Sequence, residues 1–168
     1  MELTRFFLGQ LEREAAASRK VIERMPEGRN DWKPHEKSMP LGYLAALVAT
    51  MPGWVTLMIE RGELNLDDPS NDQFKTKAVE TRAELLRQLD EAVTKSRKAF
   101  EGTSEEHLMK PWKFMMGGRV VNQEPRYVMI ENGVFSHLAH HRGQLTVYLR
   151  LIDAKVPAIY GPSADEKF

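Results

Sequence analysis

The sequence of 168 residues contains no cysteine. A disulfide, a cysteine nucleophile and a thiolate metal ligand are therefore excluded. The absence of cysteine also suits a reducing compartment, so we expect the protein to act in the cytoplasm. The first residues, Met1–Arg5, lead into a polar-rich helical pattern, and no secretory leader is expected there.

The sequence also lacks an excess of charge of either sign, since 24 basic residues balance 24 acidic ones. It contains no basic run and no recognition-helix motif, so we expect no nucleic-acid partner. We find no stretch that approaches the roughly 20 apolar residues needed to span a bilayer, and we expect no membrane partner.

Four segments carry apolar residues at spacings of three and four, which is the periodicity of an amphipathic helix. They run from about Leu3 to Met25, from Ser38 past Met58, from Lys77 to Phe100 and from Pro125 to Ala154. Each segment can bury its apolar stripe only against the others. The expected fold is therefore all-α, an antiparallel four-helix bundle in a single domain of residues 1–168. The long second and third connections also allow a crossover, so spacing alone leaves the topology open.

Shorter signals mark the segments between and within these helices. Pro52-Gly53 predicts a kink in the second helix. Trp112–Val121 holds two short apolar runs around Gly117-Gly118, which predicts a small β-hairpin between helices three and four. The polar stretch Arg61–Gln73 and the tail Lys155–Phe168 are predicted to be irregular.

The most informative residues are two histidines in the last predicted helix. His137 and His141 are four residues apart, so they lie one turn apart on one face. That spacing lets one helix offer two imidazoles to one metal ion. Two core histidines with satisfied hydrogen bonds would fit the same pattern. Leu138 stands where the acid of an HExxH zincin motif would be, so that class is excluded.

Three further features carry a family resemblance. They are the run His137–Arg150, the run Trp32–Ser38 followed by Leu41–Ala45, and the Gly-Gly hairpin. Together they resemble DinB-like proteins, a family with a damage-inducible name. The resemblance covers nearly the whole chain and implies a four-helix bundle that forms a homodimer.

The resemblance also implies a divalent metal, nickel or zinc, held by three histidines. Two would be His137 and His141, and the third family position, on the second helix, is Leu47 here. A chelate of two histidines binds a metal more weakly than three. His35 from the preceding loop, or His140 after a rotation, could replace the third ligand. Alternatively, the site is decayed, and the two histidines bond to each other, to water or to the second helix.

Two functions follow from the resemblance. The first is a metal-dependent transferase (or hydrolase) that uses a small-molecule thiol of the bacillithiol or mycothiol type. The metal would lower the pKa of a bound thiol or water. In that hypothesis His140, Arg142 and Gln144 orient the substrate, although Arg142 and Gln144 equally fit a surface or a dimer interface. The alternative is a non-catalytic dimeric bundle with a decayed metal site, which binds a small apolar ligand or serves a stress response.

Other residues have plainer interpretations. Gly143 in mid-helix costs roughly 1 kcal/mol relative to alanine and is consistent with close approach of a second chain. Trp54 and Tyr148 are predicted to be packing residues, and the charges from Glu12 to Glu14 to form a solvated face.

Overall fold

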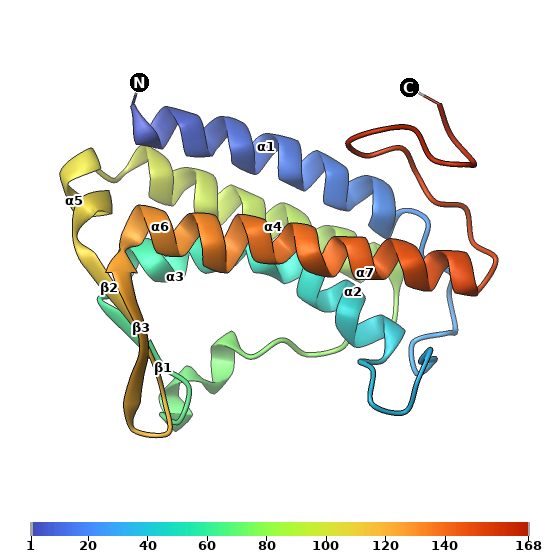
Figure 1. Cartoon of the computed structure of the whole chain (residues 1–168), viewed down its shortest axis with the longest axis horizontal. Helices are drawn as coiled ribbons and strands as arrows, with labels where there is room; N and C mark the ends of the chain where they lie inside the picture. The colour runs from blue at the N-terminus through green and yellow to red at the C-terminus, as the bar shows by residue number, and fades with distance from the viewer. Residues whose placement is uncertain (1, 168) are drawn as a thin grey trace.

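The computed structural model describes residues 2–167, and only the backbone at 73 and 74. The predicted domain of residues 1–168 and the predicted tail to Phe168 therefore extend beyond the described residues. The chain is mostly helical, with a small sheet at one end of the helices (Figure 1). The helices are α1 (Leu3–Ile22), α2 (Leu41–Thr50), α3 (Trp54–Glu60), α4 (Arg82–Glu101), α5 (Glu105–Met109), α6 (Arg126–Ile130) and α7 (His137–Leu151).

Two of the four predicted helices are composite. A 3-10 turn, η1 (Met51–Gly53), joins α2 to α3, which confirms the interruption predicted at Pro52-Gly53. A π-helical segment, η3 (Glu131–Ser136), joins α6 to α7. No sequence signal predicted this π segment, which places one extra residue in a helical turn.

Several helix ends differ from the predicted ones. The second helix begins at Leu41 rather than Ser38, directly after Pro40. The helix α4 begins at Arg82 rather than near Lys77, because the Thr81 side chain accepts a hydrogen bond from the Glu84 backbone N–H and caps it. The residues before Thr81 instead continue the connection that follows a second 3-10 segment, η2 (Pro69–Phe74).

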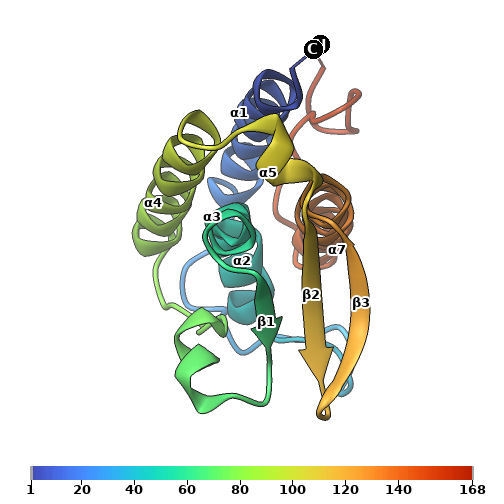
Figure 2. The ribbon, with the colours of Figure 1, turned by 90° about the vertical axis from the view of Figure 1, so that its left-hand side faces the viewer.

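The sheet contains β1 (Glu63–Asn65), β2 (Pro111–Met116) and β3 (Arg119–Pro125), in that order. The antiparallel pair β2–β3 confirms the predicted hairpin. Gly117 and Gly118 both have positive φ angles, as its tight turn requires. The strand β1 pairs parallel to β2, with Leu64 opposite Phe114, and lies in the stretch that was predicted to be a loop. All three strands extend away from the helices on one side (Figure 2).

The helices are not all antiparallel to their neighbours. Ion pairs Arg19–Asp90 and Glu12–Arg97 join α1 to α4 in antiparallel order. In contrast, α4 runs parallel to α2–α3: Ala92 lies beside Gly53, and further along both helices Ser96 contacts Thr56. The prediction of a fully antiparallel bundle was therefore wrong. The connection through β1 and η2 crosses back along the bundle before α4 starts (Figure 1).

The segment Leu41–Glu60 is long and apolar enough, by length and composition, to cross a membrane. The expectation that no such stretch exists was therefore wrong. However, 72% of its apolar window is buried inside the protein. The segment packs against α4 and α7, as the core helix of a soluble protein does.

Candidate functional site

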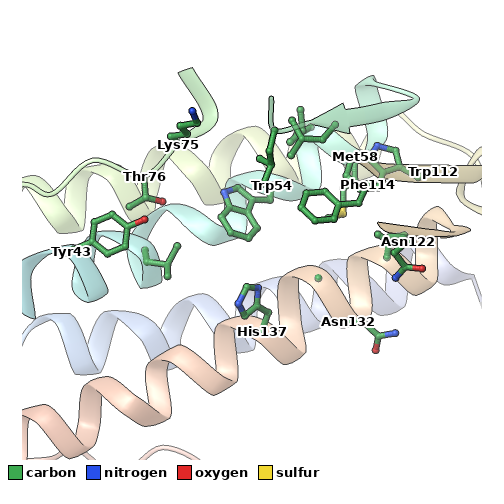
Figure 3. A pocket seen from close by; sticks show the side chains of 16 residues that line it. Tyr43, Trp54, Met58, Lys75, Thr76, Trp112, Phe114, Asn122, Asn132 and His137 are labelled. Atoms are coloured by element: carbon green, nitrogen blue, oxygen red, sulfur yellow. The ribbon is translucent and has the colours of Figure 1, made fainter. Parts of the chain in front are cut away.

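A cavity of about 680 Å³ lies between α2–α3, the α6–α7 helix and the sheet. The second helical segment contributes Tyr43, Leu47 and Trp54, and the hairpin contributes Trp112 and Phe114. The side chains converge on the space between the layers (Figure 3). This volume lies within the usual range for small-molecule sites.

His137 lines this cavity, and His141 lies one turn further along α7. Their Nε2 atoms are 2.8 Å apart, and the ring centroids are 4.5 Å apart. The Trp54 ring lies 5.9 Å from the His137 ring, on the opposite wall (Figure 3). The helical spacing therefore brings the two imidazoles together as the sequence predicted, with one of them facing the cavity.

The outer nitrogens of the two rings face oxygen atoms. His141 Nδ1 lies 2.8 Å from Gln144 Oε1. The His137 ring bonds the backbone of Gly133. We assign this bond to Nδ1, since Nε2 faces His141. If both Nδ1 atoms donate, the two Nε2 lone pairs point at each other and require a cation between them.

Burial affects whether a proton can be the cation between the two Nε2 atoms. It lowers the pKa of both His137 and His141, and so opposes a shared proton. A rotated Gln144 amide, which would donate to His141 Nδ1, leaves a neutral pair with one hydrogen between the Nε2 atoms. A metal ion held by both Nε2 atoms is the other arrangement, because ligand histidines commonly donate their second N–H to an oxygen.

The π segment sets the position of this pair. It carries Gly133, which lines the cavity and also bonds His137 through its backbone. A side chain at Gly133 would meet Met58 Cε at 3.2 Å, so the small residue keeps α3 and the π segment in close contact. π segments occur frequently at functional sites, which makes this one part of the candidate site.

Leu47 lies on the same cavity, with 7% of its surface exposed. It therefore occupies the wall where the resemblance implied a third ligand, and its side chain offers no donor atom. Among the described residues, no group of three histidine or acidic side chains could hold a metal ion. Thus, these residues fit a cation with two nitrogens, and they do not fit a three-histidine centre.

The two predicted replacement ligands lie apart from the cavity wall. His140 is exposed, with its ring 5.1 Å from the His141 ring. His35 is exposed in the loop before α2, where its Nδ1 accepts a hydrogen bond from the Lys37 backbone N–H. Neither residue is among those that line the cavity.

Arg142 faces away from the cavity, because it follows His141 on the helix. It is 1% exposed and forms an ion pair of 2.6 Å with Glu14. It also donates to Ser18 Oγ and contacts Tyr160. Its interpretation as a substrate-orienting or surface residue was therefore wrong, and Glu14 does not belong to a solvated face. Arg142 ties α7 to α1 and to the C-terminal tail.

The cavity wall is almost free of charge. Lys75 is the one charged side chain among the described lining residues, and it forms an ion pair with Asp72. The remaining polar groups include the hydroxyls of Tyr43 and Thr76 and the imidazole of His137. The site therefore combines an apolar enclosure with a few neutral hydrogen-bonding groups.

Sequence reasoning missed most of this wall. Trp54 was predicted to be a packing residue; it does pack against the core, and it also lines the cavity. Trp112 and Phe114 alternate along β2 and so share one face of the strand. That alternation was available in the sequence. In contrast, nothing in the sequence placed Lys75 and Thr76 at the cavity.

Comparison with known proteins gives consistent matches over most of the chain. The family model described as "DinB family" matches residues 3–167. An uncharacterized protein of Bacillus subtilis, YrdA, is 24% identical over 160 residues, which are 95% of this chain and 89% of that protein.

Solved structures of DinB-like proteins have the same fold. The one from Bacillus cereus gives a TM-score of 0.69 at 20% identity, covering 92% of this chain and 95% of its own. The YjoA protein from Bacillus subtilis gives 0.66 at 20% identity, with 88% and 92% covered. The one from Exiguobacterium sibiricum, described as a putative family member, gives 0.64 at 19% identity, with 91% and 93% covered. At these identities the likeness shows the fold alone.

Proposed function

This chain belongs to the DinB family, and from that premise we propose that it binds a small molecule in the cavity beside His137 and His141. The molecule fills the space between α2–α3, the sheet and α6–α7. Its polar group lies at His137, which is the imidazole that faces the cavity. In this proposal the protein binds a small ligand, and the metal site that the family resemblance implies is incomplete.

The observation that carries this proposal is the aromatic wall of the cavity opposite the half-buried His137 of the histidine pair. Trp112 is buried and Trp54 is half-buried, so rigid rings form part of the cavity wall, beside leucine and methionine side chains. Apolar enclosure with a few converging polar groups is the usual composition of a ligand site. Leu47 extends the apolar wall at the position where a metal ligand would otherwise stand.

A fragment screen by ligand-observed NMR tests this proposal. The natural protein should bind fragments that a cavity-filled variant, Leu64→Trp, does not bind. Leu64 is half-buried and lines the cavity, whereas Met109 is exposed on α5 and does not line it. Met109→Trp is therefore a matched control that keeps binding. Equal fragment binding by all three proteins would refute the proposal.

The second candidate function is the metal-dependent transfer of a small-molecule thiol. The convergence of two Nε2 atoms, with both Nδ1 atoms facing oxygen, favours a bound nickel or zinc ion. Elemental analysis of untagged protein purified without chelator tests it. About one nickel or zinc per chain, together with turnover of thiols and electrophiles, supports this candidate. Absence of metal after incubation with excess ion would exclude it.

We also propose that the protein is a cytoplasmic homodimer that pairs through α7. Gly143, Val147 and Leu151 recur every four residues on its exposed side, and the last two side chains are each 56% exposed. A Cβ at Gly143 would meet nothing within 4 Å, which leaves room for a second helix. Sizing should give a dimer that Val147→Glu converts to a monomer; a natural protein that is monomeric at every concentration would refute this.

A further inference from the structure

We infer that the cavity takes an uncharged, largely aromatic molecule and discriminates against charged relatives of the same size. This inference rests on the proposed binding function and specifies the class of ligand. It follows from the charges, the hydrogen-bonding groups and the shape of the wall, each of which excludes a different type of molecule.

The first argument is the absence of a counter-charge. No aspartate or glutamate lies among the described residues that line the cavity, so a ligand cation would have no carboxylate to pair with. The one lining cation, Lys75, is 56% exposed and already faces Asp72. A ligand anion would therefore leave water without gaining an unpaired positive partner. Moving an unpaired charge into such surroundings is strongly unfavourable.

The second argument comes from the polar groups that do reach the cavity. The side chains of Tyr43 and Thr76 lie toward one end of the cavity, and His137 lies nearer the middle (Figure 3). All three are hydrogen-bonding groups that carry no charge when the imidazole is neutral. These groups suit hydroxyl, carbonyl or amine groups on an uncharged ligand.

The third argument is the aromatic surface. Trp54, Trp112 and Phe114 come from two different walls of the cavity. Aromatic rings contribute large contact areas and favour offset or edge-to-face contacts with other rings. An aromatic ligand would contact the rings of both walls at once.

Two dyes with the same ring system test the inference. N-phenyl-1-naphthylamine is uncharged, and 8-anilino-1-naphthalenesulfonate adds one sulfonate to it. Fluorescence titration of the natural protein should show one uncharged dye bound per chain. Its Kd should be at least about tenfold lower than that of the sulfonate, which corresponds to about 1.4 kcal/mol. A sulfonate that binds equally well or more tightly overturns the inference.

Variants test where the dye binds, and they separate the claim about the binding site from the claim about the ligand class. Leu64→Trp, or Thr76→Trp if the first variant unfolds, should abolish binding of the uncharged dye, while Met109→Trp should not. A sulfonate that binds more tightly and loses affinity in Lys75→Ala refutes the ligand class but keeps the binding site. No binding of either dye refutes the inference and the proposed function together.

Discussion

The Nε2 atoms of His137 and His141 lie 2.8 Å apart, and Leu47 lines the same cavity as His137. The pair is therefore preorganised for one shared cation or one shared hydrogen. The cavity wall around the pair supplies apolar contacts in place of a third metal-ligating atom. This relationship makes the cavity, rather than a metal centre, the main candidate for function.

Restoring the third donor should change the chemistry of the pair. Leu47→His is expected to create nickel or zinc affinity at least about tenfold above that of the natural protein, because three imidazoles bind a metal more tightly than two. Isothermal titration calorimetry with each metal measures this change. Leu47→Asn is a control of similar size with no imidazole, and it should not gain affinity. Equal affinity of the natural protein and Leu47→His would show that the natural site is already complete.

Arg142 should be a determinant of stability rather than of activity. Arg142→Met leaves the carboxylate of Glu14 partly buried without its partner, so we expect a loss of about 3–5 kcal/mol in the free energy of unfolding. Chemical denaturation measures it. Arg97→Met, which removes an exposed ion pair with Glu12, should cost less than about 1 kcal/mol. Similar losses in both variants would contradict the structural role of Arg142.

Acid should release the C-terminal tail. Arg150, followed by the Val156 backbone N–H, holds the pKa of Asp165 below its usual value. The Ala158 backbone N–H, followed by Arg24 and Lys20, lowers the pKa of Glu166. Carboxyl groups with a lowered folded-state pKa stabilise docking above the unfolded value near 4, and this contribution is lost as the pH falls through the folded value.

NMR measures this release through the Val156 and Ala158 amide signals, which should move toward their unfolded positions as the pH falls below about 4. In Asp165→Asn the Val156 signal should already be displaced at pH 7. Signals that remain unchanged throughout the titration would show that these carboxyl groups do not hold the tail.

The sequence predicted the parts of the fold that follow from local periodicity. Local sequence patterns predicted the helices, the break at Pro52 and the Gly117-Gly118 turn, because each of these depends on neighbouring residues. The parallel packing of α4 on α2–α3 was not, because it depends on where the connection crosses the bundle. The pairing of β1 with β2 joins Leu64 to Phe114, which are distant in the sequence.

The candidate site was predictable to a similar extent. Spacing on one helix brought His137 and His141 together, and Leu47 was identified as the departure from the family pattern. Arg142 was misinterpreted, because adjacent residues on a helix point in different directions and its partner Glu14 lies on another helix. The cavity itself depends on how the sheet packs over α3, which no local pattern indicates.

The most direct test of the account uses the indole N–H signals of the three tryptophans in ¹⁵N-labelled protein. Trp54 and Trp112 line the cavity, whereas Trp32 packs against Tyr148, with ring centroids 5.6 Å apart. Saturating N-phenyl-1-naphthylamine should shift the signals of Trp54 and Trp112 and leave that of Trp32 in place. No shift, or a shift of Trp32 as large as the others, would contradict binding in this cavity.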